Sequence, residues 1–600
     1  MPFVTASTQR GPYDVIIVGS GAGGGQAAYT LCMEGVRVLM LEAGRRYSPA
    51  HETPMFQTPD MAPLGDSVTP DKNFGFYDAT VDGGWDVPGQ PYVTVPDKWG
   101  GRFTWWRARM LGGRTNHWGR ISLRNGPYDF KPRTRDGLGL DWPIVYNDVA
   151  PYYDKVEMLV GVYGGDISRE NTPAGPGDTL LPPPTPLVSD HLFMQRAPRV
   201  GITVLPGRRA VLTRAQDHRT FPGKLHPGNP RAQKILAEAM RKRSPCLWAT
   251  PCGRGCAVAA NYQSTTVHLP PALATGNLDI ITNAMVYEVT TDGNGRANGV
   301  RFIDAINGRH EHARARIIVL GASAFETARI LLNSKSGRYP DGLGNSSGLV
   351  GRYILDTVGS SVSGQIPLLE SLPPLNENAA GGLQVYAPWW LYKEQLAHKL
   401  PFPRGYHIEY GGGKQMPGAY TFYDLEWLTG GSYGKKLKED ARRYYGSFVE
   451  FDGRGAMVPN DNCYVEIDPK VKDRFGIPVL RFHWQWGDYE QRQAAHMQET
   501  FGAVVEAMGG RVQTPVITDP VKAISSGGQM IHEVGGTVMG AEARSSVTNR
   551  WSQTWDVPNL FVADGGVFPY NADKNPTLTI MALAWRMSDH ILERMRRREI

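Results

Sequence analysis

Short apolar runs and glycine-rich turns alternate in the first part of the chain. Residues 14–18 form a β-branched run typical of a buried parallel strand, and residues 36–41 form a second apolar run. The segment between them, centred on 27–31, predicts a helix. A strand, a helix and a second strand in this order indicate the start of a parallel α/β unit.

Further strand patterns lie hundreds of residues away. Residues 317–320 form another apolar run, and a helix is expected around 327–332. Residues 406–410 and 479–484 predict long strands of a substrate-facing sheet. Because 600 residues are far more than one hydrophobic core usually organises, we expect two domains.

The charge and hydropathy of the chain argue against two classes of partner. The 64 basic and 58 acidic residues leave a formal net charge of +6, a mild bias and not the concentrated field that nucleic acid binding needs. The basic cluster at 594–598 fits a solvated helix end. No stretch approaches the roughly 18 apolar residues of a membrane span. We therefore expect no nucleic acid partner and no membrane span.

The cysteines and the first residues bear on the compartment. Five cysteines in a long chain do not resemble the disulfide framework of a secreted protein. Residues 1–12 show neither a charged region followed by an apolar one nor a paired-arginine signal. Both features predict a soluble protein in a reducing compartment, with the cytoplasm as the simplest location.

A phosphate-binding motif follows the first strand directly. Gly19, Gly21 and Gly24 form a G-x-G-x-x-G pattern. The first glycine permits a tight turn, the second lets a pyrophosphate approach the backbone, and the third lets the helix lie close to the strand. Glu42 ends the second strand, where an acid can accept hydrogen bonds from ribose hydroxyls. The complete unit predicts dinucleotide binding.

Later segments bear on which dinucleotide binds. The segment at 109–119 resembles the first signature of the glucose-methanol-choline (GMC) oxidoreductases. The segment at 317–323 is similar to the second signature, although Ala328 replaces a usual proline. Residues 559–565 and 575–579 resemble the C-terminal flavin-binding strand and closing helix of this family. The resemblance extends from residue 13 to about 590 and implies FAD as the cofactor.

The resemblance also implies a domain layout. It is an α/β fold, α+β overall, in which a Rossmann-like FAD-binding domain is interleaved with a substrate domain built on an antiparallel sheet. The FAD-binding domain is expected at 1–150, 246–351 and 520–600, and the substrate-binding domain at 151–245 and 352–519. The cofactor-binding residues that the resemblance adds to the glycine motif and Glu42 are Gly112, Gly113, Asn116, His117, Val286, Asp564, Pro576 and Thr577.

Alcohol oxidation requires a base for the hydroxyl proton, and histidine suits this role at neutral pH. His532 begins a run that resembles the family pattern H-x-x-G-T-x-x-M-G, with Gly536 in place of the threonine. Asn575 stands where family members carry a histidine or asparagine as second hydrogen-bond partner of the substrate hydroxyl. An amide can orient but cannot serve as the base, so His532 is the expected base. In the alternative, Asn575 only caps the helix that starts after Pro576.

The stretch from Thr115 to Trp118 resembles the one through which fungal pyranose oxidases attach FAD covalently. The resemblance implies His117 either as a covalent anchor or as a closely packed, noncovalent neighbour of the flavin. Gly119 occupies the place of a threonine that is thought to help those oxidases manage the oxygen adduct. Its presence favours a dehydrogenase over an oxidase.

Three of the cysteines, Cys246, Cys252 and Cys256, lie close together in sequence, an arrangement that thiolate ligation of iron could use. Some bacterial family members carry a three-iron cluster at a similar place, but Leu247 replaces one of their cysteines. Zinc normally needs four ligands, and no fourth cysteine or histidine lies nearby in sequence. The alternatives are an iron–sulfur cluster, reduced buried thiols, or a single strained disulfide bond.

The overall resemblance is closest to bacterial glycoside 3-dehydrogenases and pyranose oxidases. It implies oxidation of a ring hydroxyl of a sugar or glycoside, at C3 by preference or at C2 as in a pyranose 2-oxidase that reduces O2. The rival interpretation is a flavoprotein that relays electrons without alcohol chemistry. The electron acceptor is O2, a quinone or a cytochrome. Some relatives associate with a small subunit that carries the export signal, so co-export to the periplasm is the alternative to the cytoplasm.

Two further features have a functional and a structural interpretation. The aromatic side chains of His407, His483, Trp484 and Trp486 could line a sugar site, but a structural role in the sheets fits each of them better. The insertion at 51–104 is either a lid over the site or a static surface loop.

Overall fold

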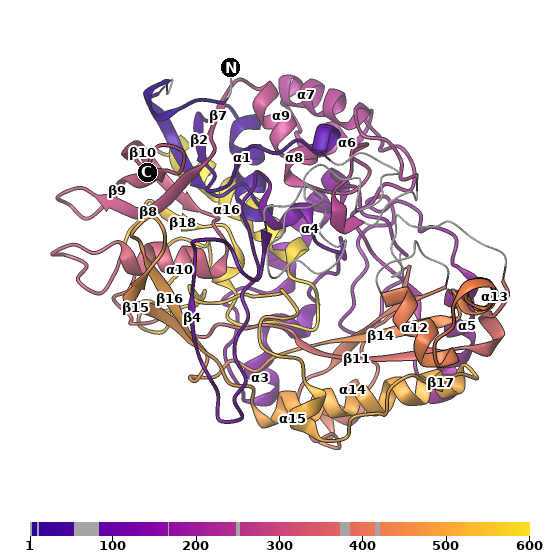
Figure 1. Ribbon diagram of the computed structural model, residues 1–600. Coiled ribbons are helices and arrows are strands. Elements are labelled where there is room, and N and C mark those ends of the chain that lie inside the picture. Colours follow the sequence, from indigo (N-terminus) through magenta and orange to yellow (C-terminus); the bar gives the residue numbers. More distant parts are fainter. Residues whose placement is uncertain are drawn as a thin grey trace.

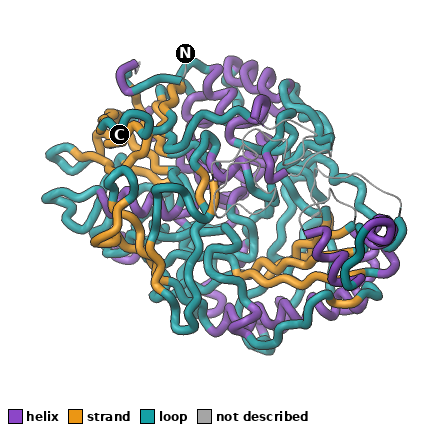
Figure 2. The backbone as a smooth tube through the Cα atoms, in the orientation of Figure 1, coloured by secondary structure: helices purple, strands orange, loops and turns teal. Residues whose placement is uncertain are grey.

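Two sheets, one mixed and one antiparallel, carry most of the strands, and long loops connect the elements (Figures 1 and 2). The loop content agrees with the 70 glycines and 45 prolines of the chain. The computed structural model describes residues 3–8, 11–52, 83–165, 167–247, 252–372, 384–413 and 420–600.

The mixed sheet has a parallel core. Its strands follow the order β7 (Leu278–Ile281), β2 (Val38–Leu41), β1 (Tyr13–Val18), β10 (His310–Leu320), β9 (Ala297–Asp304) and β8 (Ala284–Thr291). Strands β7, β2, β1 and the C-terminal half of β10 run parallel, and β18 (Leu560–Val562) pairs with that half of β10. The N-terminal half of β10 is antiparallel to β9. The parallel strands are almost entirely buried, as their continuous apolar runs predict.

Segments from the two ends of the chain lie side by side against this sheet. Helix α1 (Ala22–Met33) begins directly after the glycine-rich turn and packs against α16 (Thr577–Arg596) near the C-terminus. Figure 1 shows this as the contact between indigo and yellow ribbons. Helix α16 also packs against α4 (Tyr146–Val160). The strand–helix–strand unit predicted at the start of the chain is therefore formed, and the last helix, α16, packs against the helix of this unit.

The second sheet is antiparallel wherever its strands pair. Helix α14 (Asp488–Ala507) packs against β11 (Val358–Gln365) and β14 (Phe448–Gly455), two neighbouring strands of this sheet (Figure 1). The combination of a mixed α/β sheet and an antiparallel sheet confirms the predicted fold class. The strands follow the order β17 (Arg511–Val512), β11 (Val358–Gln365), β14 (Phe448–Gly455), β13 (Tyr406–Gly412), β12 (Val385–Ala387) and β6 (Leu205–Pro206).

The strand predicted at 479–484 forms, but in a different sheet from β13. It is β16 (Pro478–His483), which pairs with β15 (Tyr464–Lys472) and with β4 (Val93–Val95). The physical reason is an aromatic cluster, because the Phe482 ring stacks on the Phe103 ring at 4.8 Å between centroids. Strand β4 belongs to the predicted insertion at 51–104, of which residues 53–82 lie outside the described part.

The C-terminal helix ends as the sequence predicts. Helix α16 stops at Arg596, and the Arg596, Arg597 and Arg598 side chains are exposed, which fits a solvated helix end. Among the helices that the structure describes, none combines the length and the apolar character needed to cross a membrane.

Candidate active site

A cavity of about 430 Å³ lies where the parallel strands of the mixed sheet end. Gly19, Glu42, Gly321 and Asp564, which follow β1, β2, β10 and β18, line one part of it. Glu409 of β13 and Arg454 of β14 line another part. The carboxyl ends of parallel strands are the usual place for ligands in open α/β sheets. This cavity is therefore the candidate active site.

The glycine-rich turn forms one wall of the cavity. Its tight backbone packing is possible because glycine has no side chain. Gly19 has a positive φ of +93°, and a Cβ atom there would lie 2.3 Å from the Gly321 carbonyl oxygen. A Cβ atom at Gly24 would lie 2.1 Å from the Gly19 carbonyl oxygen. At Gly21, by contrast, a Cβ atom would meet nothing within 4 Å and would enter open space. This open space above a helix N-terminus fits the pyrophosphate of a dinucleotide.

Glu42 is anchored beside this turn. Its carboxylate accepts hydrogen bonds from the Ser20 backbone at 3.1 Å, the Ser20 hydroxyl at 2.5 Å and the Gly44 backbone at 2.8 Å. Burial raises the pKa of Glu42. The Ser20 hydroxyl in turn accepts a hydrogen bond from the Gly112 backbone at 2.8 Å. Glu42 is thus held at the cavity wall and tied to the loop that carries Gly112.

The loop at 109–119 supplies the next part of the wall. Gly113 and His117 line the cavity, and the His117 ring lies 5.2 Å from the Trp106 ring. Asn116 lies behind the wall, where its amide nitrogen donates to the Leu111 carbonyl at 3.0 Å. The side chain of Asn116 therefore holds the shape of the loop.

The predicted cofactor residues fall into two groups, those that line the cavity and those that lie behind its wall. Gly24, Gly112 and Asn116 support the wall from behind. The residues that line the cavity are Gly19, Gly21, Glu42, Gly113, His117, Val286, Asp564, Pro576 and Thr577, together with His532 and Asn575.

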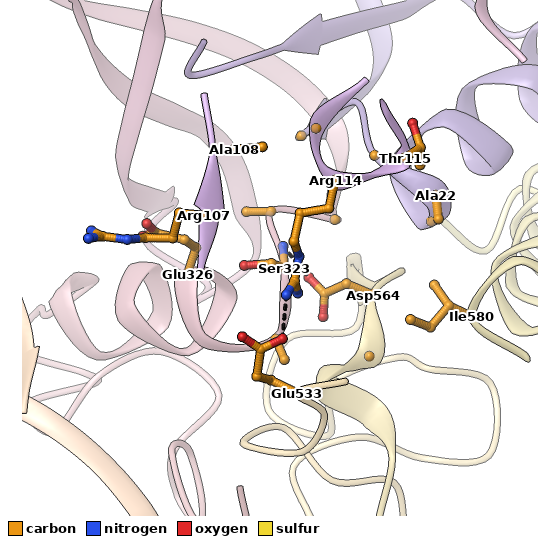
Figure 3. Close-up of a pocket in the computed structure, with 18 of the residues that line it drawn as sticks. Ala22, Arg107, Ala108, Arg114, Thr115, Ser323, Glu326, Glu533, Asp564 and Ile580 are labelled. Atoms are coloured by element: carbon orange, nitrogen blue, oxygen red, sulfur yellow. Dashed lines mark hydrogen bonds and ion pairs between the residues drawn. The ribbon is translucent and has the colours of Figure 1, made fainter. Parts of the chain in front are cut away.

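Asp564 ties two strand ends together. Its carboxylate accepts hydrogen bonds from the Thr327 hydroxyl at 2.5 Å, the Ser323 backbone at 3.2 Å and the Gly566 backbone at 2.9 Å. Thr327 lies in α10 (Ala324–Asn333), the helix that follows β10. Figure 3 shows Asp564 and Ser323 among the side chains drawn at the cavity. Burial raises the pKa of Asp564 to about 6.

His532 and Asn575 meet on one wall of the cavity. The Asn575 amide nitrogen lies 3.3 Å from His532 Nε2, and His532 Nδ1 lies 3.0 Å from the Thr357 hydroxyl. Because the amide nitrogen can only donate, it assigns Nε2 as the acceptor and Nδ1 as the protonated nitrogen. The Asn571 amide nitrogen also donates to the Thr357 hydroxyl, at 3.3 Å. The unprotonated nitrogen of His532 is thus the one beside Asn575.

The surroundings of His532 keep the imidazole neutral. Burial, and then the positive charge of Arg454, lower the pKa of His532 to about 3. The backbone nitrogen of His532 donates to Asp356 at 3.0 Å, which fixes the start of the segment. A neutral, fixed imidazole at a cavity wall can accept a proton from a bound hydroxyl group.

Several residues of the site were not predicted. Thr357, Glu409 and Arg454 belong to strand ends or strands outside the recognised motifs, and no sequence signal links them to His532. The ion pair between Arg114 and Glu533 lies inside two motifs, but its partners are 419 residues apart. Figure 3 shows Arg114 reaching across the site to Glu533, with Asp564 nearby.

The cysteine segment provides no metal site in the part of the chain that is described. Cys252 and Cys256 are buried and Cys246 is half-buried, whereas residues 248–251 lie outside the described ranges. Within those ranges, no three side chains of histidine, cysteine, aspartate or glutamate are grouped so that they could hold a metal ion. The Cys256 sulfur accepts a hydrogen bond from the Ala260 backbone at 3.3 Å.

The side chains with two interpretations take structural positions. His407 lies behind the cavity wall, where Nε2 is 3.3 Å from a Glu409 carboxylate oxygen. His483 pairs with Glu466 outside the cavity at 3.0 Å. The Trp484 ring packs at 5.0 Å against the Trp486 ring, in the cluster that contains Phe103.

Comparison with known proteins finds similar dehydrogenases and oxidases. Three relatives illustrate the range. The chain is 29% identical to 2-methyl-1,2-propanediol dehydrogenase of Mycolicibacterium austroafricanum, over 98% of this chain and 96% of that protein. It is 28% identical to the fructose dehydrogenase large subunit of Gluconobacter japonicus, over 96% and 97%. It is 29% identical to C-glycoside 3-oxidase of Arthrobacter globiformis, over 53% of this chain and 54% of that protein.

A solved structure and a family model cover most of the chain. The crystal structure of pyridoxine 4-oxidase from Mesorbium loti aligns with a TM-score of 0.57 at 16% identity, over 97% of this chain and 99% of that one, which shows the shared fold. The two parts of the family model described as GMC oxidoreductase match residues 13–357 and 459–584. The chain therefore belongs to the GMC oxidoreductase family, FAD-binding enzymes that act on CH–OH groups of sugars and other alcohols.

Proposed function

We propose that this enzyme oxidises a ring hydroxyl of a sugar or glycoside to a ketone, with C3 as the preferred position. The observation that carries the proposal is the meeting of His532 Nε2 and the Asn575 amide nitrogen, 3.3 Å apart, on a cavity with a glycine cradle. A hydroxyl group needs one acceptor for its proton and one donor to its oxygen. This pair supplies both.

The cavity residues fit FAD, which supplies the hydride acceptor for the reaction when it is bound. Gly19, Gly21 and Glu42 would hold the dinucleotide, because they combine an open helix N-terminus with a fixed carboxylate. Asp564 and Thr577 would border the same group on the side of β18 and α16. We also propose the interleaved boundaries, 1–150, 246–351 and 520–600 against 151–245 and 352–519, as the division into cofactor and substrate domains.

Residues of the chain accept and release the proton of the substrate hydroxyl group. His532 Nε2 takes the hydroxyl proton, and the Thr357 hydroxyl holds Nδ1 so that the ring keeps its orientation. Because burial and Arg454 disfavour the imidazolium form, the proton leaves His532 again in each turnover. A protein that only relayed electrons would have no use for this pair, which supports alcohol oxidation over the relay alternative.

The choice of a ring hydroxyl rests on relatives. The C-glycoside 3-oxidase is 29% identical over about half of this chain, and a fructose dehydrogenase subunit is 28% identical over nearly all of it. Gly119 lines the cavity at the place of the oxidase threonine, which favours a dehydrogenase. A pyranose 2-oxidase that reduces O2 is the second candidate.

Product analysis tests the position of attack. The enzyme is incubated with a methyl glucoside and an artificial electron acceptor, and the product is identified by NMR. We expect a 3-keto glycoside and little O2 consumption in the absence of the acceptor. A 2-keto product with stoichiometric O2 uptake would favour the pyranose 2-oxidase. Turnover of 2-methyl-1,2-propanediol without turnover of any sugar would contradict the proposal.

The rate constant of flavin reduction should depend little on pH in the range in which a free histidine titrates. With the pKa of His532 lowered to about 3, a change from pH 8 to pH 5 does not protonate the base. We therefore expect the rate constant of anaerobic flavin reduction to change less than about threefold over this range. A tenfold loss per pH unit below about 6.5, the ordinary pKa of histidine, would contradict a neutral His532.

One nearby group needs a control in that experiment. Burial, and then the charge of Glu533, raise the pKa of Asp356 to about 7. Because Asp356 accepts the His532 backbone hydrogen, its titration could change the rate without protonating the base. A transition that disappears in Asp356→Asn belongs to Asp356, whereas one that persists belongs to another group.

Covalent attachment of FAD and the presence of an iron–sulfur cluster are tested by two separate experiments. His117 lines the cavity beside Trp106, so a covalent FAD through His117 is the alternative to noncovalent packing. Acid precipitation separates them, because only covalent flavin stays in the pellet. Metal analysis of the purified protein tests the iron–sulfur alternative at Cys246, Cys252 and Cys256, for which the described residues offer no ligand group.

We further propose a partner for electron transfer. One of the relatives is the large subunit of a fructose dehydrogenase. This similarity supports a complex in which a second protein, a quinone or a cytochrome receives the electrons. In such a complex a small subunit with an export signal would carry this chain to the periplasm. Without such a partner the cytoplasm is the proposed location.

A further inference from the structure

The orientation of the Asn575 amide is set by its neighbours. Its nitrogen lies 3.1 Å from Glu409 Oε1 and 3.3 Å from His532 Nε2. Its oxygen is buried and has no hydrogen-bond partner among the residues that the structure describes. Both partners that are present therefore contact the nitrogen side of the amide.

Glu409 decides this orientation because a carboxylate can only accept hydrogen bonds. If the amide turned over, its oxygen would face the carboxylate oxygen, and the two acceptors would repel each other. With the nitrogen toward Glu409, one N–H is used by Glu409 and the second is directed to His532 Nε2. When a hydroxyl group binds between His532 and Asn575, this second N–H can turn from Nε2 to the substrate oxygen, which leaves Nε2 to accept the hydroxyl proton.

Other side chains hold Glu409 in place and keep it ionised. Arg454 Nη2 lies 3.1 Å from Glu409 Oε2, and His407 Nε2 lies 3.3 Å from Glu409 Oε1. His407 and Arg454 are opposite each other in the pairing of β13 with β14. Burial alone would raise the pKa of Glu409, but Arg454 and His407 hold it below its usual range. His407 Nδ1 also contacts the backbone oxygen of Asp573, two residues before Asn575.

We propose that Glu409 is a positioning residue for alcohol oxidation, which orients the Asn575 amide so that its N–H group donates to the substrate oxygen. This inference rests on the proposed function, because it concerns the same hydroxyl site. The hydroxyl proton passes to His532 Nε2 while the oxygen accepts the Asn575 hydrogen bond. Glu409 acts through Asn575 and contacts no reacting atom.

A double-mutant cycle tests whether Glu409 acts through Asn575. Glu409→Gln keeps the size of the side chain, but its amide can donate to Asn575 and allow the wrong orientation. We expect about a 30-fold slower flavin reduction in Glu409→Gln and about a 100-fold slower one in Asn575→Ala. In the Asn575→Ala background, Glu409→Gln should cost less than about threefold. The rate constant and the substrate dissociation constant are measured by anaerobic stopped flow.

Additive effects would overturn the proposal, because they would mean that Glu409 acts independently of Asn575. A change only in the substrate dissociation constant would overturn it as well, since Glu409 would then bind substrate. Glu466→Gln is the matched control, because Glu466 is exposed and pairs with His483 away from the cavity. Its reduction rate, FAD content and melting temperature should equal those of the wild type.

A readout without turnover separates this inference from the proposed function. Neutron diffraction of the oxidised holoenzyme locates deuterium on the Asn575 nitrogen. Deuterium directed toward Glu409 and His532 is expected, and the oxygen on that side would overturn the inference. If no sugar or alcohol reduces the wild-type flavin, the proposed function fails, while the diffraction result still decides the orientation of Asn575.

Discussion

Replacement of His532 by alanine should slow substrate-dependent flavin reduction by about 1000-fold while FAD stays bound. The substitution removes His532 Nε2, the proposed acceptor of the hydroxyl proton, and leaves the Asn575 nitrogen beside it, which can only donate. The substrate must then lose its proton to water. Anaerobic stopped-flow measurement of the reduction rate constant checks the prediction, with the visible spectrum as the measure of bound FAD.

The control for this prediction is His483→Ala. His483 is a half-buried histidine that pairs with Glu466 in the sheet of β15 and β16 and does not line the cavity. Its loss should leave the reduction rate within about twofold of wild type. If His532→Ala retained more than about a tenth of the wild-type rate constant with full FAD content, His532 would not be the base.

The second large effect concerns the glycine cradle. Gly21→Val should lower the affinity for FAD by at least about 100-fold, which corresponds to ~3 kcal/mol. A Cβ atom at Gly21 meets nothing within 4 Å, so the folded chain has room for the side chain. The valine would instead occupy the space in which we place the pyrophosphate. Titration of the apoprotein with FAD, followed by flavin fluorescence, measures the loss.

A glycine elsewhere provides the matched substitution. Gly223 lies in α6 (Phe221–Leu225), and a Cβ atom there also meets nothing within 4 Å, but Gly223 does not line the cavity. Gly223→Val should bind FAD as the wild type does. If Gly21→Val bound FAD with unchanged affinity and a normal melting temperature, the pyrophosphate would not lie at this turn.

The sequence was most informative where the chain folds locally. The first strand, the glycine motif and the helix after it are contiguous, and each has a periodicity or a backbone requirement that can be read without a partner. The predicted strand at 406–410 became β13 for the same reason. The strand at 479–484 was predicted in the wrong sheet, because its pairing with β4 and the contacts of Phe482 with Phe103 and Phe325 join segments that are distant in sequence.

The active site was predicted only in part because its partners come from distant segments. His532 and Asn575 were found through family motifs, which carry no information on what surrounds them. The contacts of Thr357 with His532 and of Glu409 with Asn575 span 175 and 166 residues. Neither residue belongs to a recognised motif, and strand pairing rather than sequence spacing brings each one to the site.

The anaerobic visible spectrum of the purified protein, recorded before and after addition of a methyl glucoside, tests directly whether bound FAD oxidises a glycoside. We predict a yellow flavoprotein whose visible absorbance bleaches with the glucoside and persists with the matched 3-deoxy glucoside. Bleaching by both would keep alcohol oxidation and contradict attack at C3. A yellow protein that no sugar or alcohol bleaches, or a colourless protein that binds no FAD, would contradict FAD-dependent alcohol oxidation.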